Sequence, residues 1–75
     1  MTILVDFEKV REGTQEVEYA FGFPEMNRRL VIRTDSQEGR PLDGNENLLY
    51  QKAFGQIIRS RVSEGTWPER GSYAA

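Results

Sequence analysis

The sequence predicts an α+β domain in which a three-stranded antiparallel meander is covered on one face by a single C-terminal helix, in the order β-β-β-α. Three stretches near the N-terminus alternate apolar and polar side chains, as strands with one buried face do. A later stretch repeats its apolar side chains every three or four residues, which is typical of an amphipathic helix. A one-sided sheet and a one-sided helix each need an apolar cover, so we expect the two to pack together.

The predicted strands cover residues 2–10, 14–23 and 28–34. The second has the strongest alternation, and the third has the β-branched centre that strands favour. In each strand one set of alternate side chains is apolar and is expected to face the helix. These side chains are Ile3, Val5, Phe7, Val17, Tyr19, Phe21, Phe23, Leu30 and Ile32.

The two turns test whether these faces agree, because a slip of one residue would send every core side chain to the solvent side. A three-residue loop at residues 11–13, with its glycine in the left-handed conformation, and a four-residue loop at residues 24–27 both keep the apolar faces together. This agreement supports the meander. The expected opposite pairs are Phe7 with Val17, Val5 with Tyr19, Phe21 with Leu30 and Tyr19 with Ile32.

A polar loop and the helix follow the strands. Residues 35–44 are rich in turn formers and show no periodicity. The helical stripe comes next, and Gly65 is suited to end the helix. Its apolar residues are Leu49, Ala53, Phe54, Ile57, Ile58 and Val62.

The start of the helix has two competing signals. Asp43 with Glu46 reads as a capping box, whereas Asn45 could cap the helix alone. Gly55 in the helix interior costs about 1 kcal/mol relative to alanine. We therefore expect Gly55 to allow a close approach between the helix and the sheet.

The last ten residues contain Gly, Pro and Ser and no run typical of a helix or a strand. We interpret residues 1–65 as the domain and residues 66–75 as a flexible tail. The tail holds Trp67 and Tyr73, which belong to the residue types that anchor interfaces. Trp67 either anchors a partner or folds back over the helix end to complete the core.

Composition excludes several kinds of chemistry. The chain has 75 residues, no Cys and no His, and 10 basic against 12 acidic residues. Disulfides, thiol nucleophiles, Cys/His zinc sites and a Ser-His-Asp triad are therefore excluded, and no cofactor or metal site is predicted. A domain this small has little room for an enclosed active site, so we expect no enzymatic activity. No apolar run reads as a signal peptide or a membrane span, so a cytoplasmic location is expected.

Four carboxylates share the outer face of the predicted sheet. They are Asp6, Glu8, Glu16 and Glu18. The expected register sets Asp6 opposite Glu18 and Glu8 opposite Glu16, and like charges in such positions are destabilising. This acidic patch either awaits a divalent cation or a basic partner, or is a solvated face partly neutralised by arginines of the third strand.

Apolar residues on the same outer face stay uncovered because the single helix packs on the other face, and a three-stranded sheet has two unpaired edges. Both features suggest a site for a protein partner or a second copy of the chain, since assembly is a usual supplement to a small core. The candidate partner-binding residues are Leu4, Arg29, Val31, Arg33, Trp67 and Tyr73.

The sequence therefore predicts a small cytoplasmic protein-interaction module. The alternative is a weak nucleic-acid-binding domain in which arginines contact phosphates. The predicted register separates the arginines at 29 and 33 from the aromatic face, which weakens a base-stacking mode. An enzyme would need a cleft shared between copies and would use the outer-face carboxylates.

Overall fold

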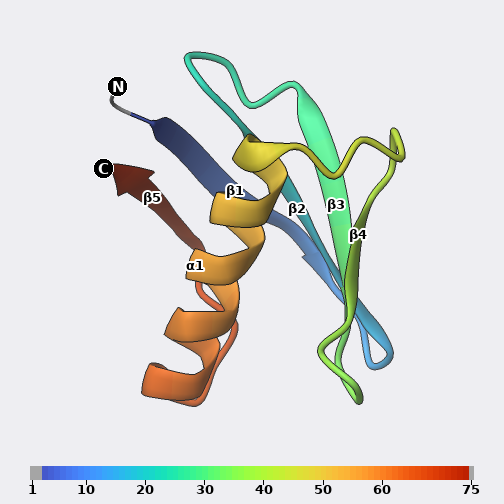
Figure 1. Cartoon of the computed structure of the whole chain (residues 1–75). Coiled ribbons are helices and arrows are strands. Elements are labelled where there is room, and N and C mark those ends of the chain that lie inside the picture. Colours follow the sequence, from blue (N-terminus) through green and yellow to red (C-terminus); the bar gives the residue numbers. More distant parts are fainter. Residues whose placement is uncertain (1–2, 75) are drawn as a thin grey trace.

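Five strands and one helix make up residues 3–74, the part of the chain that the computed structural model describes (Figure 1). The strands form one antiparallel sheet in the order β4-β3-β2-β1-β5, and the helix packs against β1, β2 and β5 on one face. The elements are β1 (Leu4–Glu12), β2 (Glu16–Gly22), β3 (Arg28–Arg33), β4 (Gly39–Pro41), α1 (Leu48–Glu64) and β5 (Arg70–Ala74).

The α+β class and the antiparallel sheet with one helix are confirmed, but the sheet has two further strands and the helix is not the last element. β4 forms within the segment expected to be a loop. β5 forms within residues 66–75, which were expected to be a flexible tail. Neither strand has a strong alternating pattern in its sequence. Each is held mainly by backbone pairing with a neighbouring strand, so its side chains did not indicate it. Residue 2, the expected start of the first strand, and residue 75 lie outside the described residues.

The register of the first hairpin differs from the prediction. Phe7 lies opposite Phe21 instead of Val17, because the turn occupies residues 13–15 and the ladder shifts between Lys9 and Arg11. The glycine of this turn is not left-handed. At Phe7 the displacement is an even number of residues, so Val5 and Phe7 still point into the core.

The second hairpin is displaced in the same even manner. Tyr19 lies opposite Leu30 instead of Ile32, since the connection spans residues 23–27 and is longer than the expected four-residue loop. Gly22 enters this connection at a φ of 146°, and a Cβ there would lie 2.3 Å from the Glu25 carbonyl oxygen. Only glycine fits this position.

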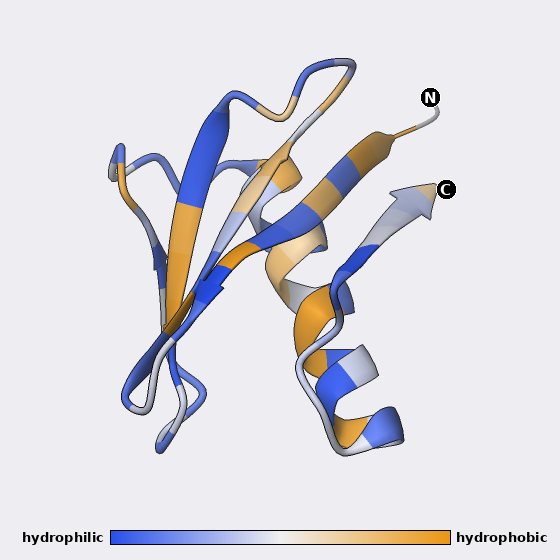
Figure 2. Cartoon of the chain, turned by 180° about the vertical axis from the view of Figure 1, so that it is seen from behind, coloured by the Kyte–Doolittle hydropathy of each residue, from blue (hydrophilic) through white to orange (hydrophobic). Residues whose placement is uncertain are grey.

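The core lies between α1 and the sheet. Figure 2 shows orange and blue bands along β1, whose buried side chains are Val5 and Phe7, whereas the apolar Leu4 and Val10 are exposed. Val62, expected on the apolar stripe, is 71% exposed, so the stripe does not reach the end of α1. The residues that form the core are Val5, Phe7, Val17, Tyr19, Phe21, Leu30, Ile32, Tyr50, Ala53, Ile57 and Trp67.

The helix starts later than either expected signal. Asn47 is the N-cap, and its side chain accepts a hydrogen bond from the Tyr50 N–H, so Asp43, Glu46 and Asn45 do not cap the helix. The predicted end is confirmed, because Gly65 follows the helix at a left-handed φ of 79°. The expected close approach at Gly55 is wrong, since no atom lies within 4 Å of a Cβ built there.

Arg28 ties the loop before α1 to the sheet. Its Nε and one terminal nitrogen donate to the two Asp43 carboxylate oxygens at 2.8 and 3.0 Å, and it also bonds the Asn47 side chain and the Asn45 carbonyl. The guanidinium lies 4.7 Å from the centre of the Phe21 ring. Hydrogen bonds from Arg28 lower the pKa of the Asp43 carboxyl. One side chain thus fixes the approach to the helix N-terminus.

Replacing Gly55 with alanine is expected to raise the free energy of unfolding by about 1 kcal/mol, because the exposed site has room for a methyl group and alanine favours helix. Urea denaturation measures the effect. The matched control, Gly65→Ala, is expected to lower stability, since its φ of 79° suits glycine. If Gly55→Ala lowers stability instead, Gly55 has a packing role after all.

Arg28→Lys is expected to lower the free energy of unfolding, since lysine cannot reproduce the forked hydrogen bonds to Asp43. The pKa of Asp43 is lower in the folded state, so the carboxylate stabilises the fold above its unfolded pKa and loses that effect as pH falls through its folded pKa. The difference between wild type and variant should therefore shrink below about pH 4. Arg59→Lys, at an exposed helical position, is the control in the same urea titrations.

Candidate functional site

The outer face of the sheet, which points away from α1, is a network of ion pairs. Glu18 accepts hydrogen bonds from Arg11 and Arg29, each at 3.0 Å. Glu16 lies 3.7 Å from Arg11 and 4.0 Å from Arg40. These contacts join four strands of the sheet and neutralise the middle of the expected acidic patch. Their stabilising effect is small, as for most exposed ion pairs.

The like-charge pairs expected across the first hairpin, Asp6 with Glu18 and Glu8 with Glu16, are wrong. In the actual register the carboxylates of β1 lie opposite a glycine and an alanine of β2. The four acidic residues are thereby spread over the face, and Glu8 lies 3.7 Å from Arg70 of β5. Within residues 3–74, no group of three acidic residues is placed to hold a metal ion.

The apolar side chains of this face are covered to different degrees. Val31 is only 6% exposed, and it lies between Glu18 and Arg40 of the neighbouring strands. The aliphatic parts of long charged side chains cover such positions while their charged ends stay in water. Leu4, at the start of β1, is 36% exposed. Val31 is thus covered, whereas Leu4 and Val10 of β1 are exposed.

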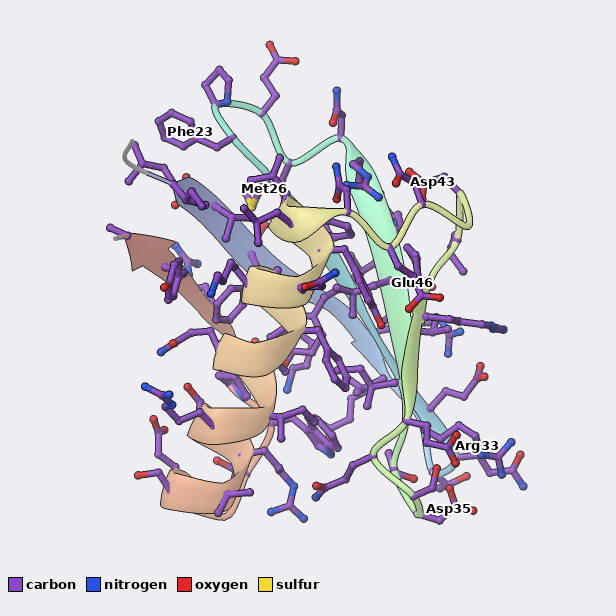
Figure 3. All side chains as sticks on the ribbon, in the orientation of Figure 1. Phe23, Met26, Arg33, Asp35, Asp43 and Glu46 are labelled. Carbon is purple, nitrogen blue, oxygen red and sulfur yellow. The ribbon has the colours of Figure 1, made fainter. Side chains whose placement is uncertain are left out.

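Arg33 and Asp35 form an ion pair at 3.1 Å beside the turn that follows β3. The hydrogen bonds from Arg33 lower the pKa of the Asp35 carboxyl. Figure 3 places this pair at the opposite end of the molecule from the exposed side chains Phe23 and Met26. Arg33 therefore belongs to a local turn contact and is separated from the apolar end.

The edge of the sheet at β4 is poorly suited to strand pairing. Backbone hydrogen bonds join Glu38 and Leu42 to β3. Successive residues of a strand direct their backbone groups to opposite sides, so those of Gly39 and Pro41 point away from β3. Proline has no N–H to donate. A Cβ at Gly39 would also lie 2.6 Å from the Phe54 ring, so the helix side chains press against this strand. The edge is short and blunted.

The edge at β5 has a different character. The Lys9 N–H donates to the Glu69 carbonyl at 2.7 Å, so the backbone groups of Glu69 face β1. Every second residue of a strand faces the same neighbour, so the backbone groups of Gly71 and Tyr73 also point toward β1. Those of Arg70, Ser72 and Ala74 point away from the sheet. Figure 1 shows β5 at the margin of the sheet, with no other drawn element beside its outer edge. β5 thus presents a row of complete N–H and C=O groups.

Three contacts hold the segment that leads into β5. The Tyr19 hydroxyl donates to the Pro68 carbonyl at 2.5 Å, and burial raises the pKa of this phenol, which keeps it a donor. The Lys9 ammonium lies 3.0 Å from Glu69. Trp67 is only 8% exposed, as the core-completing interpretation expects, and the Arg61 guanidinium lies 5.4 Å from its ring centre.

An open cleft of about 620 Å³ lies between the first hairpin and the helix end. Its lining mixes both signs of charge, including Lys9, Arg61 and Glu64. The Lys9 ammonium is already bound by Glu12 at 2.6 Å, and this hydrogen bond raises its pKa. Backbone carbonyls at the end of a helix also disfavour anions. The cleft therefore offers no charge pattern that selects a ligand.

The structure does not gather the predicted partner-binding residues into one site. Leu4, Arg29, Val31 and Arg33 lie along the outer face, Trp67 is in the core, and Tyr73 packs against the core from β5. Sequence reasoning missed the outward-facing positions of β5, which are Arg70, Ser72 and Ala74. The available signal was the interface-type Tyr73 in a segment assigned no structural task. The candidate functional site is the free edge of β5.

Tyr19→Phe is expected to lower the free energy of unfolding by about 1 kcal/mol, because the Pro68 carbonyl loses its donor. Hydrogen exchange should quicken at the β5 amides of Gly71 and Tyr73 more than in β3. Tyr50→Phe is the control, since hydroxyl loss there breaks no contact to β5. Uniformly faster exchange across the sheet would contradict a specific role of the Tyr19–Pro68 hydrogen bond in holding β5.

Comparison with known proteins finds no relative of this chain. No protein-family model, curated protein or solved structure matches the chain. Over residues 3–74, the single helix is too short and too polar to cross a membrane.

Proposed function

We propose that this chain is a non-enzymatic protein-interaction module that binds an extended strand of a protein partner along β5. The observation that carries the proposal is the outward row of backbone groups at Arg70, Ser72 and Ala74. Such a row can add a strand through main-chain hydrogen bonds. The proposal includes a cytoplasmic location, in which the edge meets other soluble proteins.

The side chains of β5 favour this use. Lysine and proline, which commonly guard exposed edges, are absent from β5. Arg70 is the only charged residue of the strand, and Gly71, Ser72 and Ala74 are small. Figure 2 shows most of β5 in pale colours, so affinity would come from the backbone rather than from an apolar patch.

The paired charges favour a protein partner over nucleic acid. Arg11 and Arg29 share Glu18, Arg28 is held by Asp43, and Arg33 is held by Asp35. A phosphate would have to compete with these carboxylates for each guanidinium, while nucleic-acid affinity comes largely from cations that neutralise phosphates. A protein strand would leave the ion pairs intact.

A bait experiment with Ser72→Pro tests the proposal. The Ser72 N–H faces away from β1, so proline should leave the β1–β5 pairing intact while removing the central outward donor. We expect the tagged wild-type chain to retain a protein from nuclease-treated extract of its native cells, with retention falling at least about tenfold for Ser72→Pro, the loss expected from about 1.4 kcal/mol. Quantitative mass spectrometry measures the retention.

Ser72→Ala is the matched control, because it removes the hydroxyl and keeps the N–H. It should retain the same protein as wild type, and tryptophan fluorescence of the buried Trp67 should confirm that both variants are folded. Equal retention by Ser72→Pro would show that the partner binds elsewhere. Retention that requires intact nucleic acid would favour the arginine-based alternative.

A further inference from the structure

The free edge of β5 is self-complementary, and we infer that its occupant is a second copy of this chain, paired antiparallel about Ser72. This inference rests on the proposed function and names the partner. With Ser72 facing its counterpart, Arg70 lies opposite Ala74 and Gly71 lies opposite Tyr73. Each outward-facing residue then meets another outward-facing residue, which antiparallel hydrogen bonding requires.

The alternation of the backbone selects this register. A shift of one residue would set an outward-facing residue against one whose groups bind β1, and the ladder would fail. A shift of two residues would restore the alternation but would leave one end of each five-residue strand unpaired. Centring on Ser72 pairs the whole of β5 with the whole of its counterpart.

The side chains fit this register as well. The two Arg70 side chains start about 13 Å apart along the strands, so like charges do not oppose each other. Tyr73 faces Gly71, where the tip of the Phe7 ring fills the place of the missing side chain, since a Cβ there would lie 2.6 Å from it.

The same register keeps the two layers of the fold in order. Gly71 and Tyr73 lie on the face covered by α1, as shown by Phe7 beside Gly71 and by Lys52 lying 5.4 Å from the Tyr73 ring centre. Pairing Gly71 with Tyr73 therefore joins the inner face of one sheet to the inner face of the other. The dimer is one continuous sheet with both helices on the same side.

Cysteine cross-linking of the purified full chain tests both partner and register, and the absence of native cysteine gives a clean background. Opposed residues in a hydrogen-bonded antiparallel pair have Cα atoms about 5.5 Å apart, within the range of a disulfide. Ser72→Cys alone is expected to form a disulfide-linked dimer under mild oxidation. Arg70→Cys alone should not, whereas an equimolar mixture of Arg70→Cys and Ala74→Cys should form the mixed dimer.

Sedimentation equilibrium of the cysteine-free wild type should show concentration-dependent doubling of the 8.7 kDa mass. Ser72→Pro should remain monomeric up to concentrations at least about tenfold higher, and Ser72→Ala should behave as wild type. The helix variant Ser63→Cys is the control for random collision, because Ser63 is exposed near the end of α1.

Two outcomes would overturn the inference in different ways. A wild-type monomer whose extract partner is still lost in Ser72→Pro would refute self-pairing and keep strand addition to β5. A dimer that survives Ser72→Pro, or that cross-links no better through Ser72→Cys than through Ser63→Cys, would place the self-contact on another surface. In that second case the extract experiment with the same variants separately decides whether β5 binds a different protein.

Discussion

The hydrogen bond from the buried Tyr19 hydroxyl to the Pro68 carbonyl joins the middle of the sheet to the chain that leaves the helix. A buried hydroxyl without a partner is costly, so this contact fixes where the chain passes after Gly65. From that point Trp67 enters the core, Glu69 bonds β1, and residues 70–74 continue as β5. The position of the free edge, and with it the candidate site, follows from this return.

The outer face shows why a nearly balanced charge composition has structural consequences. Arg11 and Arg29 reach Glu18 from both neighbouring strands, and Arg40 approaches Glu16 from β4. Each pair stabilises the fold little, but together they cover the apolar side chains beneath them and occupy the guanidinium groups. The outward-pointing backbone groups of the sheet lie at its two edges, β4 and β5.

Sequence pattern predicted the elements that have their own hydrophobic periodicity and missed those held by pairing. The alternation in β1, β2 and β3 placed most core side chains on the correct face, because the register errors at Phe7 and Tyr19 were even. Phe23 and Val62 were also expected to face the core, but both are exposed. β4 and β5 have few apolar side chains, so nothing local indicated them. Among the candidate residues, Trp67 and Tyr73 were singled out by type alone, whereas the edge itself is a backbone property that becomes visible only with the sheet order.

The two edges of the sheet together limit how large an assembly can grow. If β5 pairs with β5, the joined sheet ends on both sides in β4, where Pro41 lacks an N–H and Gly39 is pressed by the Phe54 ring. Neither end then accepts another strand readily, and the two-fold contact uses the same surface on both copies. An unguarded edge usually risks open-ended aggregation, but here the opposite edge stops growth at two chains. An edge at β5 that can pair and an edge at β4 that cannot are therefore together consistent with a closed dimer.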